Sequence, residues 1–373
     1  MLDNNIKAAV LEQPKKFKID IYKKPNIGDN DILLKIVLCG ICGSDVHFWK
    51  GTLGLKEPII LGHEFIGEIA EIGNKASEGR NLKVGDMVAV EIIMPCYQCE
   101  WCKNGIYRLC AKDDTASTNT YGRQFGCNIP IKVPPTPLWG GFAQYLFIPG
   151  EAITHKFEKK VEPKEAVLTE PFATAIHAIE RAEPKVGESC VIFGPGTIGL
   201  CLTVAAKLKG LFPIILIGAD KNDESRLKLG KELGADYVIN LSNIKKEPIL
   251  LIRELVNSLG VDISIDASGS SIAQILALRA LKRGGRNVMV GISNNRSISI
   301  IPDSDIVFKE ITIYGSILNK GYSKAIKLIE NNKISLKKIV THEFSLDDIE
   351  EAFIRADSKE ENMIKVVINP WKN

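Results

Sequence analysis

A glycine-rich turn between a strand-like run and a helix-like run constrains the fold of this chain more than any other feature. The apolar run Ser189–Phe193 leads into Gly194-Pro195-Gly196-Thr197-Ile198-Gly199, and residues with a helical period follow. In this context the first glycine makes the turn, the second lets the backbone approach a pyrophosphate, and the third lets helix and strand pack closely. The helix N-terminus stabilises phosphate charge. We therefore expect a dinucleotide at this turn; a glycine turn without a ligand is the alternative.

Strand-like and helix-like runs alternate through the second half of the chain. The strand-like runs are Ser189–Phe193, Ile214–Ile217, Tyr237–Ile239, Asp262–Asp266, Asn287–Val290 and Ile311–Tyr314. The helix-like runs are Ile198–Leu208, Glu224–Leu233, Pro248–Leu259 and Ser271–Leu281. This alternation predicts an α/β fold whose doubly wound, six-stranded parallel sheet carries helices on both faces.

The first part of the chain, up to about residue 150, follows a different pattern. Short apolar runs at Ile32–Leu38, Phe65–Ile72, Met87–Ile93 and Ala143–Ile148 are separated by Gly, Asp, Asn and Pro turns. This spacing favours an antiparallel barrel or sandwich over βαβ units. The tail from residue 317 holds two helix-like stretches and ends in the strand-like run Ile364–Ile368.

Composition and charge exclude several classes of protein. The 373 residues are 45% hydrophobic and 25% charged, and 48 Lys+Arg against 45 Asp+Glu give a net charge of +3. This composition is that of a folded globular protein, and the near balance of charge gives no reason to expect a nucleic-acid or membrane-surface partner. The most apolar run, Leu211–Ala219, contains Pro213 and is shorter than the about 20 residues of a membrane-spanning helix. Because the N-terminus lacks a signal-peptide pattern, we expect a cytoplasmic protein.

Four of the nine cysteines, Cys96, Cys99, Cys102 and Cys110, have the spacing C-x2-C-x2-C-x7-C. In a reducing compartment cysteines are more often metal ligands or packing residues than disulfides. Four thiolates close a tetrahedral zinc site and leave no open position, so we expect a structural zinc. Unligated thiols and an iron–sulfur cluster are the alternatives. A further set is interpreted as packing residues: Cys39, Cys127, Cys190 and Cys201.

Several motifs follow one another at the separations of one known family. They are Gly40-Ile41-Cys42-Gly43-Ser44-Asp45-Val46-His47, Gly62-His63-Glu64-Phe65-Ile66-Gly67, Gly85-Asp86-Met87-Val88, the four-cysteine loop and Thr341-His342-Glu343-Phe344. Over essentially its whole length the chain resembles the zinc-dependent medium-chain alcohol/polyol dehydrogenase family, in its sorbitol/threonine dehydrogenase-like branch. The resemblance implies a GroES-like, β-rich catalytic domain (residues 1–172 and 317–373) and a Rossmann domain (residues 173–316). It also implies two zinc ions per chain and a homodimer or homotetramer.

The catalytic zinc ligands of the family fall on matching residues of this sequence. The resemblance implies that Cys42 and His63 bind the catalytic zinc and that Glu170, in Thr169-Glu170-Pro171, is the third ligand. Glu64 is either a direct or an alternate ligand. Thiolate, imidazole and carboxylate supply two negative charges against the ion's two positive ones and leave a position open. Spacing alone does not join these residues; taken singly, a core cysteine, a turn histidine and a capping glutamate are commoner.

Residues close to Cys42 are implied as carriers of the substrate proton. Ser44 would receive the proton and His47 would pass it outward, while Asp45 would orient an imidazole ligand. For Ser44 and Asp45 turn chemistry is the alternative. Aromatic candidates for the substrate pocket, with plain packing as the alternative, are Phe48, Trp49, Tyr121 and Trp139.

The choice between NAD and NADP depends on the end of the second strand of the alternating half. NAD enzymes carry an acidic residue there, about 20 residues after the glycine motif, and the expected position holds Gly218. Asp220 could reach the ribose hydroxyls, which favours NAD. Alternatively, Gly218 leaves room for a 2′-phosphate held by Lys221 or Arg226, or Asp220 only leads into the following helix.

Together these features predict a zinc-dependent, NAD(P)-linked and reversible oxidation of a secondary alcohol or polyol to a ketone. We expect the catalytic zinc to stabilise the substrate alkoxide and hydride to pass to the nicotinamide. The substrate would be a small-molecule alcohol. The alternatives are a zinc-independent quinone or enone reductase on the same fold and a non-catalytic scaffold that binds the cofactor.

Overall fold

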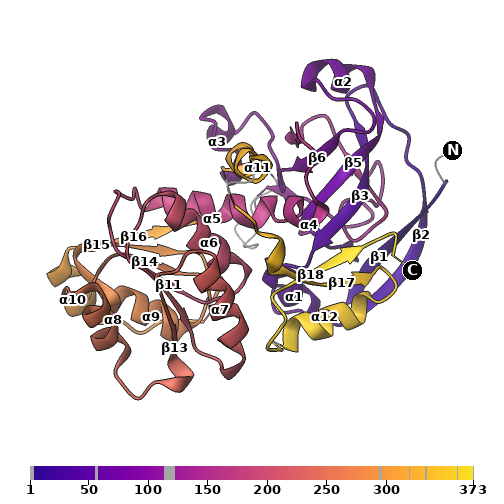
Figure 1. Ribbon diagram of the computed structural model, residues 1–373. Coiled ribbons are helices and arrows are strands. Elements are labelled where there is room, and N and C mark those ends of the chain that lie inside the picture. Colours follow the sequence, from indigo (N-terminus) through magenta and orange to yellow (C-terminus); the bar gives the residue numbers. More distant parts are fainter. Residues whose placement is uncertain are drawn as a thin grey trace. The chain divides into compact units, whose positions relative to one another are not determined.

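The computed structural model describes residues 4–54, 58–112, 122–293, 296–318, 320–331, 334–358 and 360–372. The chain packs as two compact units, whose elements are labelled in Figure 1. Unit 1 comprises Met1–Glu170, Tyr322–Ser358 and Lys365–Asn373, and unit 2 comprises Pro171–Gly321 and Lys359–Ile364. The sequence predicts a catalytic domain of residues 1–172 and 317–373 and a cofactor domain of residues 173–316. This functional division of the chain stays a prediction.

Unit 2 is built on a six-stranded sheet in the order β13-β12-β11-β14-β15-β16, and all its neighbours pair in parallel. The strands are β11 (Cys190–Phe193), β12 (Ile214–Gly218), β13 (Tyr237–Asn240), β14 (Val261–Asp266), β15 (Leu281–Met289) and β16 (Thr312–Gly315). The helices are α5 (Thr169–Arg181), α6 (Thr197–Leu208), α7 (Glu224–Glu232), α8 (Pro248–Val256), α9 (Ser271–Ala280) and α10 (Pro302–Asp305). The predicted doubly wound parallel sheet is confirmed.

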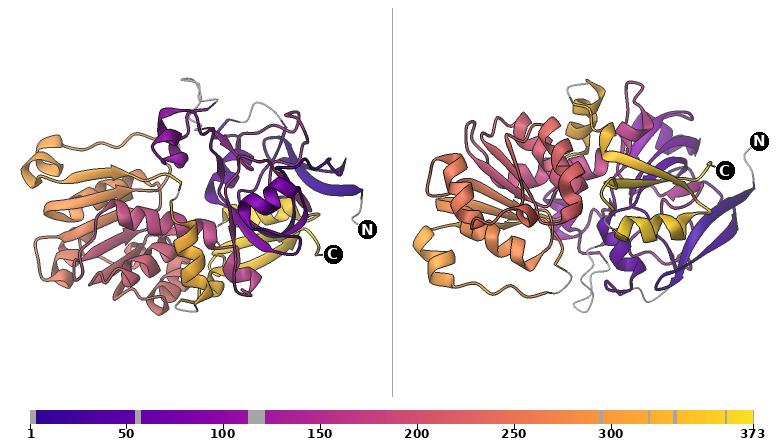
Figure 2. Two further views of the ribbon diagram at one scale, coloured as in Figure 1. Left: turned by 90° about the horizontal axis from the view of Figure 1, so that it is seen from above. Right: turned by 60° about the horizontal axis from the view of Figure 1, so that its bottom comes forward.

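Helices cover both faces of this sheet because the strand order reverses between β11 and β14. Crossovers between parallel strands are right-handed. Helices that connect strands in one direction across the sheet therefore lie on one face, and helices that connect strands in the opposite direction lie on the other face. Helices α6 and α7 pack against β12, whereas α8 and α9 pack against β14 (Figure 2). On the second face Ile252 and Ala277 join Val191 and Ile215 of the sheet in one buried apolar cluster. The reversal places the carboxyl end of β11, where the glycine turn begins, at the topological switch point of the fold.

Unit 1 contains a seven-stranded sheet in the order β10-β6-β5-β3-β18-β17, with β9 also paired to β3. Its strands are β3 (Ile32–Gly40), β5 (Glu64–Ile72), β6 (Met87–Val90), β9 (Tyr145–Ile148), β10 (Thr154–Lys156), β17 (Val340–Ser345) and β18 (Lys365–Asn369). The smaller sheets contain β1 (Asn5–Gln13), β2 (Lys16–Lys23), β4 (Ile59–Ile60), β7 (Ile93–Met94) and β8 (Arg123–Gln124). Apart from the parallel pair β17–β18, the pairing is antiparallel, as predicted for the β-rich half.

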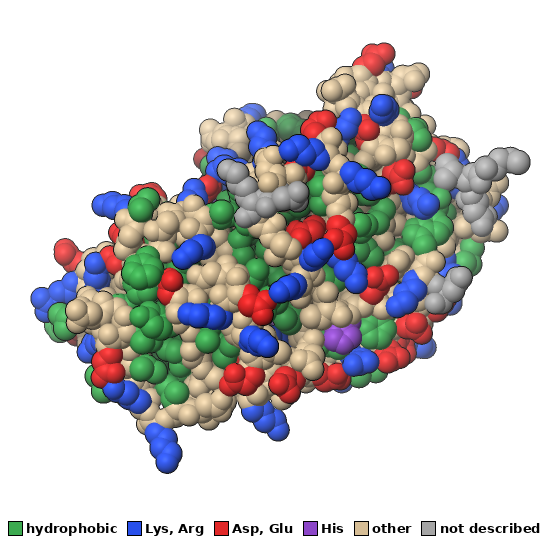
Figure 3. Space-filling model, in the orientation of Figure 1, with side chains coloured by type: hydrophobic (Ala, Val, Ile, Leu, Met, Phe, Trp, Pro, Cys, Tyr) green, Lys and Arg blue, Asp and Glu red, His purple; other side chains and the backbone are tan. Residues whose placement is uncertain are grey.

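Short helices connect the strands of unit 1. They are α1 (Gly43–Trp49), α2 (Asn74–Arg80), α3 (Glu100–Lys103), α4 (Pro163–Ala166), α11 (Tyr322–Glu330) and α12 (Ile349–Ser358). Among the described residues no helix combines the length and the apolar character needed to cross a membrane. On the face drawn in Figure 3, acidic and basic side chains are interspersed, in keeping with the small net charge.

Candidate active site

Three strands of unit 1 converge where the first candidate metal ligands lie. Gly40, the last residue of β3, pairs with Glu64, the first residue of β5, and also with Val367 of β18. Cys42 follows the end of β3, and His63 directly precedes β5. Because the three strands are neighbours in one sheet, residues far apart in the sequence meet where these strands end or begin.

The ends of these strands bring three metal-binding side chains together. The Sγ atom of Cys42, a ring nitrogen of His63 and a carboxylate oxygen of Glu64 lie within 4.8 Å of one another. His63 and Glu64 are buried. Gly40 makes room for the carboxylate, because a Cβ atom there would lie 2.5 Å from Oε2 of Glu64.

Asp45 connects two of these residues. Its Oδ2 accepts a hydrogen bond from the backbone N–H of Cys42 at 2.9 Å, and its Oδ1 lies 3.3 Å from Nδ1 of His63. Since Nδ1 faces the carboxylate, Nε2 of His63 is the nitrogen left to face a ligand. The completely buried Asp45 thus fixes both the loop that carries the thiol and the orientation of the imidazole.

Lys365, at the start of β18, is a site residue that the sequence did not reveal. Its ammonium group donates to Oε2 of Glu64 at 2.5 Å and to the carbonyl oxygen of Ile41 at 2.9 Å. Burial alone would lower the pKa of Lys365, but the nearby charges of Glu64 and Cys42 raise it above its ordinary value. The lysine therefore stays charged and holds one oxygen of Glu64, which leaves the other oxygen for a metal.

The electrostatic environment of His63 favours a cation. Burial alone would lower the pKa of His63, yet Cys127, Asp45 and Cys42 around the ring raise it well above the usual range. Burial also raises the pKa of the Cys127 thiol. Cys127 and Cys39, both interpreted as packing residues, are buried beside the site.

The donor set fits zinc better than the hard cations. Thiolate, imidazole and carboxylate are the ligand types of catalytic zinc, which takes three protein ligands and keeps one position for substrate. Within the described part of the chain, Glu170 is not in the group formed by Cys42, His63 and Glu64. It is buried in the first turn of α5, and its charge acts on Lys365. The structure therefore brings Glu64, rather than Glu170, directly to the thiol and the imidazole.

The two proposed proton carriers lie on α1, directly after Cys42. Ser44 Oγ lies 3.5 Å from Nε2 of His63, the nitrogen left free by Asp45. His47 is one helical turn further along, and its Nδ1 lies 3.3 Å from Oγ1 of Thr52 in an exposed position. Residues three apart on a helix share a face, so Ser44 and His47 lie in line from the metal-binding group towards solvent.

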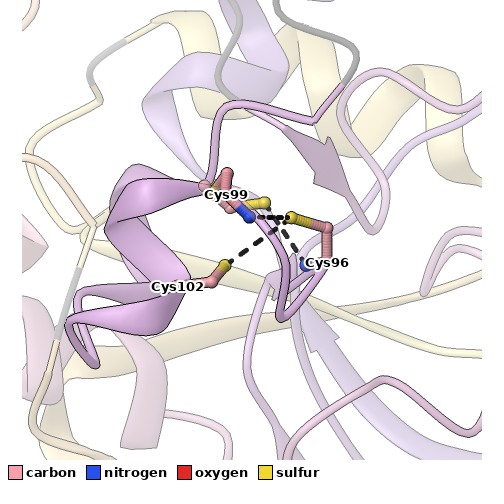
Figure 4. Close-up of side chains that lie close together, drawn as sticks. Cys96, Cys99 and Cys102 are labelled. Atoms are coloured by element: carbon pink, nitrogen blue, oxygen red, sulfur yellow. Dashed lines mark hydrogen bonds between the residues drawn. The ribbon is translucent and has the colours of Figure 1, made fainter.

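The four-cysteine loop forms a second compact metal-binding group. The Sγ atoms of Cys96, Cys99, Cys102 and Cys110 lie within 4.8 Å of one another. Figure 4 shows three of these side chains converging, with Cys102 on α3. Backbone N–H groups point at the sulfurs: that of Cys99 lies 3.3 Å from Sγ of Cys96, and that of Cys96 lies 3.4 Å from Sγ of Cys110. Such N–H donors favour thiolates, so the group suits a closed, tetrahedral zinc site.

The glycine turn of unit 2 has the geometry that a pyrophosphate requires. Gly194 has a φ of +102°, and its N–H donates to the carbonyl of Ile217 at 2.8 Å. A Cβ atom on Gly199 would lie 1.8 Å from the carbonyl oxygen of Gly194, so no other residue fits there. A Cβ atom on Gly196 would meet nothing within 4 Å, and this glycine precedes the first turn of α6. The space above Gly196 is therefore open to a ligand at the helix N-terminus.

The end of β12 carries the residues expected to choose between NAD and NADP. Gly218 ends the strand, and Asp220 accepts a hydrogen bond from the N–H of Asn222 at 2.9 Å. Asp220 is partly exposed, and Lys221 is exposed.

Arg226, the other candidate for a 2′-phosphate contact, is buried and engaged. Its Nη1 donates to Asp223 at 2.9 Å, and its Nη2 donates to the carbonyl of Met363 at 2.6 Å. A guanidinium held in this way does not turn outward to a phosphate without breaking both bonds.

The described aromatic candidates for a substrate pocket are buried packing residues. Trp49 packs against Phe353 with ring centroids 5.9 Å apart and the rings tilted by 49°, and Trp139 packs edge-on at 5.4 Å on Phe147. Phe48 is buried as well. Tyr121 lies outside the described residues.

Two family models match this chain. Residues 28–158 match the family model described as alcohol dehydrogenase GroES-like domain, and residues 197–331 match that described as zinc-binding dehydrogenase. Sorbitol dehydrogenase of Bacillus subtilis (strain 168) is 32% identical over 372 residues, with 98% of each chain covered.

Two similar solved structures contain nicotinamide cofactors. A zinc-binding dehydrogenase of Sinorhizobium meliloti 1021 bound to NADP has a TM-score of 0.82 and 26% identity, with 99% of this chain and 100% of that chain covered. An alcohol dehydrogenase of Escherichia coli CFT073 complexed with NADH has a TM-score of 0.84 and 25% identity, with 98% and 100% covered.

Proposed function

The chain belongs to the zinc-dependent medium-chain polyol dehydrogenases and is an NAD(P)-linked alcohol dehydrogenase, and from this premise we propose which residues carry its reaction. Cys42, His63 and Glu64 hold the catalytic zinc, and Glu170 is the alternate carboxylate ligand. The observation that carries this assignment is the 4.8 Å grouping of one thiol, one imidazole and one carboxylate, held from behind by Asp45. Cys96, Cys99, Cys102 and Cys110 hold a structural zinc.

The side chains around the metal group position the substrate hydroxyl and move its proton. When bound, zinc lowers the pKa of an alcohol hydroxyl and the nicotinamide ring accepts hydride. Ser44 accepts the hydroxyl proton and His47, part-exposed on the same face of α1, releases it to solvent. Unit 1 is then the catalytic domain and unit 2 the cofactor domain.

The substrate we propose is an acyclic polyol of the sorbitol type, oxidised at a secondary hydroxyl. The support is the polyol named for the relative that is 32% identical over nearly the whole chain. Steady-state reduction of NAD with a polyol series tests this directly. Turnover of polyols that is abolished in Cys42→Ser supports the proposal. Reduction of enones or quinones that survives both Cys42→Ser and a chelator would favour the zinc-independent reductase instead.

We propose NAD as the cofactor, with Asp220 as the ribose carboxylate. The support is that Arg226, one of the two cations considered as contacts of a 2′-phosphate, already binds Asp223 and the carbonyl of Met363. Of the two, Lys221 alone is exposed. Dissociation constants for NAD and NADP, measured by protein fluorescence, test the choice. Asp220→Ala should weaken NAD binding about tenfold and leave NADP binding unchanged, because a carboxylate–ribose contact contributes about 1.4 kcal/mol. Tighter binding of NADP by the unaltered protein would contradict it.

We propose a homo-oligomer, dimer or tetramer, formed in the cytoplasm. Strand β16 ends the six-stranded sheet with Ile313 39% exposed, and an exposed apolar edge strand favours pairing with a second copy. None of the nine cysteines, all of which lie within the described residues, forms a disulfide, in keeping with a reducing compartment. Light scattering after gel filtration tests the oligomer: Ile313→Lys should shift the mass towards one chain.

A further inference from the structure

The carboxylate of Asp223 fills the space beside Gly218, the residue that ends β12. A Cβ atom on Gly218 would lie 2.9 Å from Oδ2 of Asp223 and 2.9 Å from its Cβ. NAD enzymes place an acidic side chain at this end of the second strand, where it meets a ribose hydroxyl of the cofactor. In this chain the strand supplies no side chain there, and a carboxylate reaches the same place from the short 3-10 helix Lys221–Asp223 that follows.

Three donors hold the carboxylate of Asp223. The backbone N–H groups of Ala219 and Asp220 both donate to its Oδ2 at 3.0 Å. Nη1 of Arg226 donates to its Oδ1 at 2.9 Å. Consecutive N–H groups that point at one oxygen, together with a guanidinium, are the donors that bind phosphate oxygens in proteins. These three donors form an anion cradle, and Asp223 occupies it from within the chain.

The anion cradle is closed to a second anion. The side chains of Asp223 and Arg226 are only 10% and 11% exposed. On its other side Arg226 donates from Nε and Nη2 to the carbonyl oxygen of Met363 at 3.2 and 2.6 Å, and all these residues belong to unit 2. A phosphate on the ribose would therefore meet a carboxylate where it needs a cation, and like charges repel strongly away from bulk water.

We propose that Asp223 is the specificity-determining residue that makes this chain select NAD over NADP. By occupying the anion cradle it denies a 2′-phosphate the two N–H groups and the guanidinium, and its own charge repels the phosphate. Asp220, whose N–H belongs to the cradle, remains the residue whose carboxylate contacts the ribose. The inference deepens the proposed function and rests on it, because it takes the ribose of the cofactor to lie at the end of β12.

Removal of Asp223 should open the anion cradle to the 2′-phosphate. The readout is the ratio of the dissociation constants of NADP and NAD, each measured by fluorescence titration, because a general loosening weakens both cofactors and leaves the ratio unchanged. Asp223→Ala should lower this ratio at least about tenfold, since the charged and N–H donors then go to the phosphate. Asp223→Asn, the milder variant in case the first does not fold, keeps the cradle filled without its charge and should lower the ratio less.

Two further variants separate the anion cradle from a general effect on unit 2. Adding Arg226→Met to Asp223→Ala should remove most of the gain in NADP affinity, because the guanidinium is the cation of the opened cradle. Asp305→Ala is the matched control and should leave the ratio unchanged. Asp305 is buried in the same unit, where its Oδ2 accepts from the N–H of Ile301 at 2.9 Å and its Oδ1 accepts from Nε of Arg279 at 3.2 Å.

The inference and the proposed cofactor fail in different ways. An unchanged ratio in both Asp223 variants would overturn the inference, and so would an equal fall in Asp305→Ala or a gain in NADP affinity that survives Arg226→Met. These outcomes leave the choice of NAD by the unaltered protein intact. Tighter binding of NADP than of NAD by the unaltered protein would instead contradict the proposed cofactor, which is the premise of the inference.

Discussion

The ammonium group of Lys365 lies 2.5 Å from the carboxylate of Glu64, although 301 residues separate them in the sequence. Both side chains are buried, and β18 brings the lysine to the end of β3 beside the first residue of β5. A buried carboxylate without a partner is costly, so the lysine stabilises Glu64 and holds it in one orientation.

Lys365→Met should weaken zinc binding at the Cys42 group. Removing the partner that orients a ligand costs about 10–100-fold in affinity, and the freed carboxylate is then buried and unpaired. Competition with a chelator of known affinity measures the change. Lys365→Arg keeps a donor and should retain more of the affinity than Lys365→Met; equal affinity in all three proteins would contradict the role of the ion pair.

Gly196→Ala and Gly199→Ala should differ in their effects on cofactor affinity and on the free energy of unfolding. A methyl group on Gly196 meets open space, so the free energy of unfolding should change by no more than about 0.5 kcal/mol while cofactor affinity falls at least about tenfold. A methyl group on Gly199 would lie 1.8 Å from the carbonyl of Gly194, which should cost about 1–3 kcal/mol of stability as well. Denaturant unfolding and fluorescence titration with the cofactor separate the two effects. Undiminished cofactor binding by Gly196→Ala would contradict the position of the pyrophosphate.

Asp262 should stabilise the protein at neutral pH and lose that effect in acid. Partial burial would raise the pKa of Asp262, but the ammonium of Lys282 and the hydroxyl and N–H of Ser189 lower it below the ordinary 3.8. A depressed carboxyl pKa contributes stability above the unfolded value, and this stability disappears as the pH falls through the folded value. Asp262→Asn should therefore cost about 0.5–1 kcal/mol at neutral pH, a small figure because the ion pair is partly exposed.

Urea unfolding over a range of pH checks the sign of this effect. The difference between Asp262→Asn and the unaltered protein should shrink below the ordinary carboxyl pKa of 3.8. Asp303→Asn, on an exposed side chain of α10, is the matched control and should change little. A difference that stays constant into acid would contradict the assigned shift.

Cys99 should be the most reactive thiol of the four-cysteine loop once metal is removed. Hydrogen bonds from the backbone of Ala111 and of Cys102 lower the pKa of Cys99 to about 6, whereas burial raises the pKa of Cys102 to about 12. Because thiolates alkylate and thiols do not, iodoacetamide at neutral pH should label Cys99 first in the metal-free protein. Mass spectrometry of peptides reads the order, and added zinc should protect both residues. Equal labelling of Cys99 and Cys102 would contradict the shifts.

The sequence predicted the elements of unit 2 well because their signals are local. A strand, a glycine turn and a helix follow one another within a few residues, and β11 to α6 appear where the pattern placed them. The strands β1 and β2 were not predicted, and the single run Met87–Ile93 is divided between β6 and β7. Strands β1 and β2 pair with each other across a tight turn, whereas β3 pairs with β5, which lies further along the chain. Periodicity does not report pairing between such distant strands.

The choice of metal ligands likewise depends on strand pairing that the sequence does not reveal. Cys42 and His63 stand in recognisable motifs, and the sequence offered both Glu64 and Glu170 as carboxylate ligands. Only the register of β3 with β5 brings Glu64 into the group. Lys365 had no local signal, because a single lysine at the start of a strand is unremarkable until β18 is seen beside β3.

The central claim is that Cys42, His63 and Glu64 hold a zinc ion distinct from that of the four-cysteine loop. The most direct test is zinc content per chain, measured by atomic emission on the unaltered protein and on Cys42→Ser, with polyol-dependent NAD reduction assayed alongside. The account predicts two zinc ions per unaltered chain, and one in an inactive but folded Cys42→Ser. A Cys42→Ser variant that keeps the zinc content and the activity of the unaltered protein would contradict it.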